Sequence, residues 1–406
     1  MKQSIETKVK QLQDENEQLV VYGAGVVGEV LCRLLQKYHV GNLVAFCDNN
    51  QNKKGQQLCG LPILSFSECC EQYSKISFLI AMNDVKYAHT QVDKTISHKI
   101  VFTHELLDML LHAEGEILSD LQPDRNMVKY MLKVCSAAQR YYQNEEKLYV
   151  RTLQLLVTER CTLKCAECSN LIQYYEKQKD CDYETLIKTI DVIDDKFDEV
   201  SEVHLIGGEP LLMSRLYDVI QYILSKNTIQ YIIIFTNGTI LPTEEQLEVL
   251  KNDRIMIHIS NYGALSRKLE EIRSKFSEKG IHYDVYDEMR WCRHSRVQDY
   301  QLNEQQLKER LRECRSAVNC VEIGDGCLFR CFYANHAYRL QAVPCEVNEY
   351  IHILDEAVTK EEIYQFLYKK DTFQICNWCN GMKFTICDLP PAEQTKKPLE
   401  YNKYPY

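Results

Sequence analysis

An alternation of strand-like and helix-like segments organises the larger part of the chain. Apolar stretches recur after residue 148, and amphipathic stretches with helical spacing separate them. The expected strands are residues 148–159, 202–208, 230–238, 254–260 and 281–287. Strands that alternate with helices pair in parallel, and ligands gather at the carboxyl ends of such strands. The pattern predicts an α/β fold over residues 148–300.

The first third of the chain has a related pattern. Residues 19–28, LVVYGAGVVG, are typical of a strand that enters a glycine-rich turn and then a helix, and further strands are expected at 43–50 and 76–82. Such a turn can hold a pyrophosphate at a helix N-terminus, and the strand at 43–50 carries an acid near the usual ribose position. The residues concerned are Gly23, Gly25, Gly28 and Asp48. We expect a small Rossmann-like domain over residues 1–120, which either binds NAD, presents a sugar nucleotide or docks without a ligand.

Three further segments complete the expected organisation. Residues 121–147 have apolar positions at helical spacing and are predicted to form a helical connector. Residues 301–388 combine two helical patterns with a candidate hairpin, VEIGDGCLFRCF, and many cysteines. Residues 389–406, rich in Pro, Lys and Tyr, are expected to be a loose terminus.

Composition and charge narrow the classes of function. The 406 residues carry a formal net charge of −10, which opposes non-specific binding to nucleic acid. No apolar stretch is long enough for a membrane span, and the polar N-terminus lacks the apolar block of a secretory signal. We therefore expect a cytoplasmic protein with reduced cysteines. The chain has 19 cysteines, and in a reducing compartment these indicate metal or redox chemistry rather than a disulfide framework.

Three cysteines are concentrated just after the first strand of the 148–300 region. Cys161, Cys165 and Cys168 form a C-x3-C-x2-C motif. Four thiolates would complete the coordination of an iron–sulfur cube, whereas three leave one iron open to a small molecule. Zinc sites usually use paired C-x2-C units from separate segments, so a structural zinc site is the less favoured alternative.

The motif and its context resemble the radical S-adenosylmethionine (SAM) superfamily. The sequences GGEP and TNG follow at the ends of later strands, in the order typical of that superfamily. The resemblance implies a partial (β/α)6 barrel, a SAM-binding 4Fe-4S cluster and a flavodoxin- or ferredoxin-type electron donor. It also implies that SAM contacts Gly207, Gly208, Glu209, Pro210, Thr236, Asn237 and Ser260. Glu167 departs from the family pattern, because the residue before the third cysteine is commonly aromatic or aliphatic.

The C-terminal cysteines resemble the start of the SPASM and twitch extensions of that superfamily. Cys314 precedes Gly326 and Cys331, and Cys376 and Cys379 form a later C-x2-C pair. The resemblance implies an auxiliary iron–sulfur cluster, and one C-x2-C pair favours the one-cluster twitch form. Cys320 competes with Cys314 as a ligand, and a zinc ribbon is the alternative for the whole set.

These features together predict a radical SAM enzyme. It would cleave SAM to a 5′-deoxyadenosyl radical and abstract hydrogen from a substrate, with oxidation or epimerisation aided by the auxiliary cluster. The N-terminal stretch CDNNQNKKGQQLCGLPIL resembles domains attached to sugar-modifying enzymes and favours a sugar or nucleotide-linked carbohydrate. The alternatives are a ribosomal-peptide maturase and, in a different class, an NAD-dependent oxidoreductase or nucleotide sensor with structural zinc.

Overall fold

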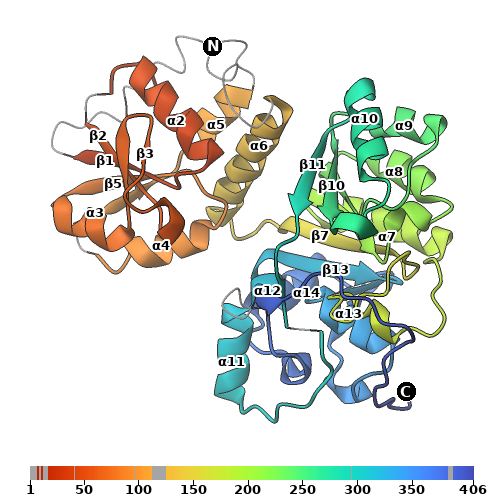
Figure 1. The fold of residues 1–406 in the computed structure, drawn as a ribbon. Helices are drawn as coiled ribbons and strands as arrows, with labels where there is room; N and C mark the ends of the chain where they lie inside the picture. Colours follow the sequence, from red (N-terminus) through yellow and green to blue (C-terminus); the bar gives the residue numbers. More distant parts are fainter. Residues whose placement is uncertain are drawn as a thin grey trace. The chain divides into compact units, whose positions relative to one another are not determined.

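The chain forms two compact units, Met1–Lys147 and Leu148–Tyr406. The computed structural model describes residues 7–8, 11, 17–40, 42–95, 97–111, 125–293, 295–382 and 387–406. Both units are α/β structures, and Figure 1 shows their helices and strands.

The first unit is a mostly parallel sheet with helices on both faces. The strand order is β3-β4-β2-β1-β5-β6, and the pairing is parallel except between β3 and β4. This is the order of a doubly wound sheet, extended by a short hairpin strand. The strands are β1 (Gln18–Tyr22), β2 (Leu43–Cys47), β3 (Gln57–Leu58), β4 (Leu61–Leu64), β5 (Ile76–Ile80) and β6 (Lys99–Val101). The helices are α2 (Val26–Lys37), α3 (Phe66–Gln72), α4 (Val85–Val92), α5 (His104–Leu111) and α6 (Arg125–Tyr142).

Strand β1 shows why the sequence of this unit reads as a continuous apolar run. Leu19 and Val21 belong to the core on one face of the sheet, whereas Val20 and Tyr22 belong to the core on the other face. A parallel strand covered by helices on both sides must be apolar at every position.

Helix α6, in the segment where a helical connector was expected, belongs to this unit. Val128, Leu132 and Cys135 are fully buried in the core that α2 and α5 also form. The apolar side of this amphipathic helix thus packs into the core of the first unit. Residues 121–124 of the expected connector lie outside the described residues.

The second unit contains an eight-stranded sheet in the order β11-β10-β9-β8-β7-β13-β14-β15. Strands β7 to β11 are parallel neighbours, and α7 to α10 follow them in turn along the chain. The strands are β7 (Tyr149–Thr158), β8 (Glu199–Gly207), β9 (Ile229–Thr236), β10 (Ile255–Asn261) and β11 (Tyr283–Asp287). The helices are α7 (Tyr183–Lys196), α8 (Leu216–Leu224), α9 (Glu244–Leu250) and α10 (Leu269–Lys279). This mixed α/β arrangement is consistent with a partial barrel.

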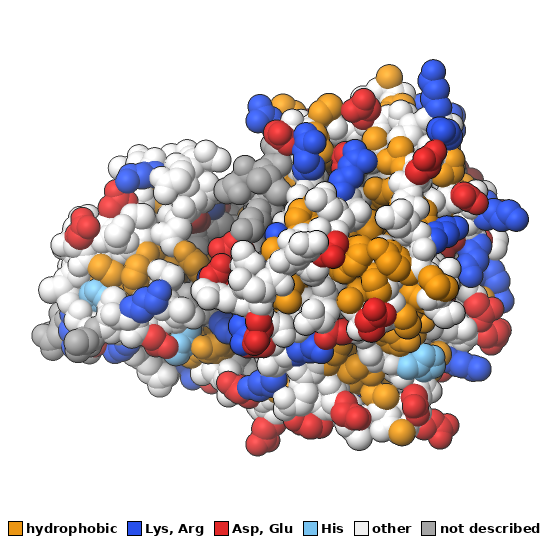
Figure 2. Space-filling view, turned by 90° about the horizontal axis from the view of Figure 1, so that it is seen from below, with side chains coloured by type: hydrophobic (Ala, Val, Ile, Leu, Met, Phe, Trp, Pro, Cys, Tyr) orange, Lys and Arg blue, Asp and Glu red, His pale blue; other side chains and the backbone are white. Residues whose placement is uncertain are grey.

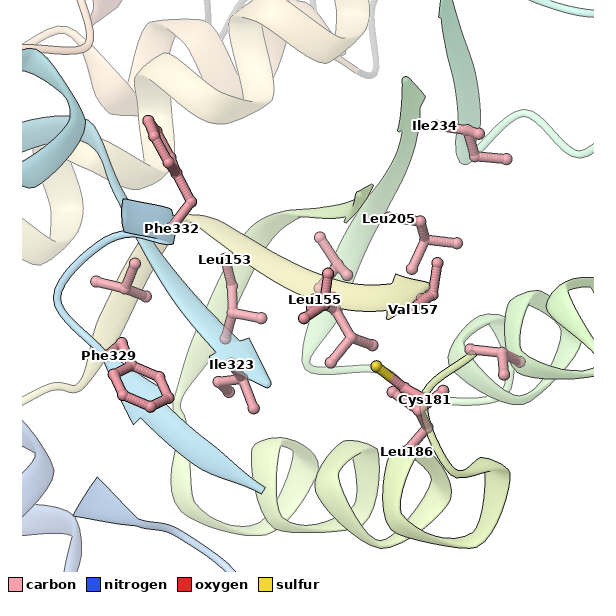
Figure 3. Packing of buried hydrophobic residues seen from close by; sticks show 14 of the residues in the cluster. Leu153, Leu155, Val157, Cys181, Leu186, Leu205, Ile234, Ile323, Phe329 and Phe332 are labelled. Atoms are coloured by element: carbon pink, nitrogen blue, oxygen red, sulfur yellow. The ribbon is translucent and has the colours of Figure 1, made fainter. Parts of the chain in front are cut away.

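Residues of these strands form one large core with the helices. Leu153, Leu155 and Val157 of β7 pack beside Leu205 of β8 and near Leu186 of α7 (Figure 3). Leu156 belongs to the same core, and the pairing of β7 with β8 is irregular between Leu156 and Thr158. The loops that carry the sequence motifs follow the carboxyl ends of β7 to β10.

The C-terminal region adds to the same sheet instead of forming a separate unit. The candidate hairpin is confirmed as β13 (Cys320–Gly324) and β14 (Cys327–Phe329), followed by β15 (Tyr350–His352). Strand β13 pairs in parallel with β7, with Ile323 opposite Leu155. The helices are α11 (Glu304–Glu313), α12 (Arg315–Asn319), α13 (Phe332–Arg339) and α14 (Lys360–Tyr364).

A small two-stranded sheet joins β12 (Trp291–Cys292) to β16 (Cys387–Leu389). The antiparallel register places Cys292 opposite Cys387, and Cys292 is disulfide-bonded. The expectation that all cysteines are reduced is therefore wrong at Cys292, because this strand pairing brings two distant cysteine positions together.

The last segment, residues 389–406, is held against the second unit, so the expectation of a loose terminus is wrong. Its backbone donates hydrogen bonds from Thr395 to Lys164 and from Leu399 to Gln173, both 2.8 Å long. The segment runs beside the loop after β7, which Figure 1 shows near the C-terminus. Backbone pairing with partners far away in sequence left no local signal to predict it.

No helix among the described residues is long and apolar enough to cross a membrane. Figure 2 shows acidic and basic side chains interspersed over one face, with apolar side chains between them. This face has no continuous basic surface of the kind that tracks a nucleic acid backbone.

Candidate active site at the three-cysteine loop

The loop that carries the three cysteines follows β7, which ends at Thr158, three residues before Cys161. The Thr158 hydroxyl donates to Asp180 at 2.6 Å, and the Cys161 N–H donates to the Gln178 side chain at 3.2 Å. Asn170, just beyond the third cysteine, donates to the Gly207 carbonyl at 2.6 Å. The side chains of Gln178 and Asp180 thus fix one end of the loop, and the backbone of Gly207 fixes the other.

The three thiols lie close enough to influence one another. Burial raises the pKa of Cys161, and the neighbouring Cys168 thiol raises it further. Burial and Cys168 also raise the pKa of Cys165 to about 11, and burial raises the pKa of Cys168. Without metal these groups are therefore neutral thiols, and a cationic iron–sulfur centre would offset the cost of holding them as thiolates. The donor set fits the three-ligand cluster.

The two glycines of the GGEP loop permit a close contact with this loop. A Cβ on Gly208 would lie 2.2 Å from the Arg160 carbonyl oxygen and 2.8 Å from the Cys161 Cβ. A Cβ on Gly207, whose φ is +146°, would lie 1.9 Å from the Thr158 carbonyl oxygen. Backbone N–H groups of Gly208 and Glu209 donate across this contact at 2.9 and 2.7 Å. Only glycine permits this approach at either position.

Glu209 joins the GGEP loop to the TNG loop at the end of β9. Its side chain is fully buried and accepts hydrogen bonds from the backbone of Asn237 at 2.8 Å and of Leu211 at 3.3 Å. Burial raises its pKa to about 7, although these hydrogen bonds and one from Thr236 act in the opposite direction. Pro210 begins the short 3-10 turn Pro210–Leu212. The acid that the family resemblance assigns to SAM therefore already connects two loops.

Asn237 extends the connection to the cysteine loop itself. Its amide donates to the Thr162 hydroxyl at 3.1 Å and approaches the Cys161 sulfur at 3.7 Å. Thr162 also bonds the Thr239 hydroxyl at 2.6 Å. The predicted residues from 161 to 168, 207 to 210 and 236 to 237 are thus brought together at the carboxyl ends of three adjacent strands.

Ser260 occupies the same edge of the sheet, at the end of β10. Its hydroxyl donates to Glu288 at 3.0 Å, and its carbonyl accepts from the Ser266 hydroxyl at 3.1 Å. Ser266 also donates to the Asn237 carbonyl at 2.8 Å, so it connects Ser260 indirectly to the TNG loop.

Sequence reasoning missed several residues of this site. Glu167 accepts from Ser295 and forms an ion pair with Arg296, so the departure from the family pattern anchors the loop to a later segment. Tyr262 lies near Cys165 and Cys168, and burial chiefly raises its pKa. Gln394, from the C-terminal segment, donates to the Cys165 sulfur at 3.1 Å. No local pattern marks any of these contacts.

The C-terminal cysteines form a second group. Burial chiefly raises the pKa of Cys331, Cys376 and Cys379, and the Cys314 thiol raises all three further. Burial raises the pKa of Cys320 to about 12, and its sulfur donates to the Ser316 carbonyl at 3.2 Å. The Cys314 thiol therefore acts on Cys331, Cys376 and Cys379 and also on Cys320, which begins β13 and donates back to α12.

A single-ion site sets a fixed spacing for its ligands. Around one zinc ion, thiolate sulfurs stand about 3.8 Å apart, because each Zn–S bond is about 2.3 Å long. Among the residues that the structure describes, no three His, Cys, Asp or Glu side chains form a group that would hold one metal ion. A multi-iron cluster is larger than one ion, so its ligands stand farther apart.

Asp48, the acid near the glycine-rich turn of the first unit, bonds to residues of the same unit. Asp48 accepts from the Ala24 backbone N–H at 3.1 Å and pairs with Lys53 at 2.9 Å. Lys53 also donates to the Ala24 carbonyl at 2.9 Å. Gly23 and Gly28 pack tightly, since a Cβ on Gly28 would lie 1.9 Å from the Gly23 carbonyl oxygen, whereas a Cβ on Gly25 would meet no atom within 4 Å. The carboxylate that was expected to contact a ribose thus forms hydrogen bonds within its own turn.

Comparison with known proteins gives one family match. Residues 155–285 match the model of the Radical SAM superfamily. No curated protein matches the chain.

Several solved structures resemble it at low identity. BtrN in complex with AdoMet and 2-DOIA is 18% identical, with a TM-score of 0.38 over 62% of this chain and 100% of that one. The anSMEcpe protein with bound AdoMet is 18% identical, with a TM-score of 0.29 over 34% of this chain and 43% of its own. SuiB of Streptococcus suis, bound to precursor peptide SuiA, is 16% identical, with a TM-score of 0.30 over 50% of this chain and 46% of its own. The family match spans the three-cysteine loop and the strands after it.

Proposed function

We propose that this radical SAM enzyme holds a 4Fe-4S cluster on Cys161, Cys165 and Cys168 and uses it to cleave SAM. The observation that carries the proposal is the contact of Gly208 with Arg160 and Cys161, which holds the GGEP loop directly against the cysteine loop. The cluster, when bound, supplies the electron that fragments the sulfonium bond of SAM.

The chain's own residues position the reactants. Glu209, Asn237 and Thr162 connect the three loops around the cysteines through hydrogen bonds of 2.8 and 3.1 Å. Such fixed positioning matters, because a misplacement of about 1 Å can cost roughly 100-fold in rate. Backbone groups of the glycine loop and the side chains at the ends of β9 and β10 would contact SAM.

The second part of the proposal concerns the C-terminal cysteines. We infer that Cys314, Cys331, Cys376 and Cys379 bind an auxiliary cluster and that Cys320 does not. Because β13 pairs with β7, the auxiliary group lies in the same unit as the first cluster. A cluster with four protein ligands has no open iron, so its role would be to accept an electron from a substrate radical or to shape the substrate site.

The substrate proposed is a sugar or nucleotide-linked carbohydrate, which the enzyme would oxidise or epimerise. This rests on the N-terminal domain and its likeness in sequence to domains of sugar-modifying enzymes. A peptide substrate is the rival, and the SPASM-like cysteine pattern is the feature that favours it. For the N-terminal domain itself, the internal bonds of Asp48 support a docking or presenting role over NAD binding.

Anaerobic reconstitution tests the reaction class. We expect about eight iron and eight sulfide per chain, as two cubes hold, and SAM-dependent formation of 5′-deoxyadenosine. Zinc without iron would refute the proposal and favour the NAD-dependent or nucleotide-sensing alternative. For the substrate, a deuterated sugar nucleotide should transfer deuterium to 5′-deoxyadenosine. Transfer from a deuterated peptide alone would replace the carbohydrate by the peptide reading.

A further inference from the structure

The C-terminal segment pairs with the cysteine loop through its backbone. Cys165 and Gln394 form an antiparallel bridge. The Ala166 N–H donates to the Glu393 carbonyl at 2.7 Å, and the Thr395 N–H donates to the Lys164 carbonyl at 2.8 Å. These two bonds flank the bridge, so the backbone of Gln394 is fixed opposite the second cysteine.

The side chain of Gln394 is also fixed in orientation. Its carbonyl oxygen accepts from the Lys164 N–H at 2.7 Å, which is a donor only. Its amide nitrogen must therefore point the other way, where it donates to the Cys165 sulfur at 3.1 Å and to the Ala392 carbonyl at 2.7 Å. The network thus assigns the N–H to the sulfur.

The donor to Cys165 comes from a more distant part of the sequence than the donors to the other two cysteines. The Cys161 sulfur accepts from the Leu163 N–H at 3.4 Å, and backbone N–H groups of Asn170 and Ile172 lower the pKa of Cys168. Those backbone donors lie within a few residues of their sulfurs, and Cys161 is also approached by the Asn237 amide at 3.7 Å, from 76 residues away. The donor to Cys165 lies 229 residues away in sequence and depends on one side chain.

We propose, resting on the proposed function, that Gln394 is a positioning residue that sets the reduction potential of the first cluster. Its N–H would remain bonded to the Cys165 thiolate when the cluster is bound. Reduction adds negative charge to a cluster and its sulfurs, so a hydrogen-bond donor stabilises the reduced form more than the oxidised form. The C-terminal segment would thereby raise the potential of the cluster and make it easier to reduce.

The variant Gln394→Glu tests the proposal with little change in shape. The remaining carboxylate oxygen can still accept from the Lys164 N–H, whereas the donor to Cys165 is replaced by an anionic oxygen. Lys396→Gln is the matched control, because it also lowers the net charge by one, two residues along the same exposed segment. Gln394→Ala, measured in parallel, removes the donor without adding charge.

The measurement is an EPR-monitored redox titration of the anaerobically reconstituted full chain. The signal followed is the one that changes when SAM is added, since only a cluster with an open iron responds. We expect the midpoint of this signal to move to more negative potential in Gln394→Ala, further in Gln394→Glu, and not in Lys396→Gln.

Each outcome bears on one of the two proposals. If either Gln394 variant that takes up iron titrates with the wild-type midpoint, the inference about Gln394 is wrong although the proposed function stands. An equal shift in Lys396→Gln would also overturn it, because charge alone would then explain the effect. A wild-type protein without a SAM-responsive signal would refute the proposed function itself.

Discussion

Replacing Gly208 by alanine perturbs the contact that places the cysteine loop against the GGEP loop. The added Cβ would lie 2.2 Å from the Arg160 carbonyl oxygen and 2.8 Å from the Cys161 Cβ. Since an ordinary contact is about 3.5 Å, one of the loops must move by roughly 1 Å. Overpacking of this kind costs about 1–3 kcal/mol of stability, whereas a displacement of that size at a reacting centre can cost roughly 100-fold in rate. The variant should therefore fold yet lose most of its SAM cleavage.

The assay compares 5′-deoxyadenosine formation, iron content and thermal unfolding in Gly208→Ala and a control, Gly280→Ala. Gly280 has φ +68° and no atom within 4 Å of its added Cβ. Alanine there costs about 1 kcal/mol of backbone strain but leaves the site untouched. We expect similar melting temperatures for the two variants and a loss of cleavage in Gly208→Ala alone. Wild-type cleavage by Gly208→Ala, or an equal loss in Gly280→Ala, would show that this contact does not position the cluster.

Three other variants test separate parts of the structure. Replacing Cys376 and Cys379 together should lower iron by about half while the SAM-responsive EPR signal remains, and unchanged iron would reassign the pair. Burial raises the pKa of Glu322 from 4.5 to about 8, so this group stabilises the fold below pH 4.5, and that stabilisation is lost as the pH rises through 8. Glu322→Gln should therefore flatten the fall in unfolding free energy that denaturation measures between pH 5 and 9. A pH profile equal to that of the wild type would contradict the shift. Asp48→Asn should lower the melting temperature of the first unit, because it weakens the pair with Lys53, while SAM cleavage stays at the wild-type rate; a cleavage defect would give Asp48 a role in the reaction.

The sequence predicted the main strands because each is a short run of apolar residues, which is typical of a buried strand. It also predicted the grouping of the motifs, since the carboxyl ends of parallel strands meet at one edge. Cys161, Glu209 and Asn237 are joined there by hydrogen bonds and close contacts. The motif spacing carried this information without any knowledge of side-chain contacts.

Other features had no local signal. The short strand β13 could have paired with several neighbours, and nothing in its five residues specifies β7 as its partner. Gln394 approaches Cys165 only through a pairing of distant backbone segments. Asp48 occupied the position of a ribose-binding acid, but the nearby Lys53 and the Ala24 N–H offered it an internal partner. Long-range and competing contacts of this kind form only in the folded chain, so a short stretch of sequence does not predict them.

The pairing of β13 with β7 has a consequence for how the protein can be divided. Strand β7 is an interior strand of its sheet only because β13 supplies its outer neighbour. A fragment that ends near residue 300 would expose the unpaired backbone N–H and C=O groups of β7 along a new edge, which invites aggregation. Residues 148–300 and the cysteine-rich segment after them should therefore be expressed together as one unit.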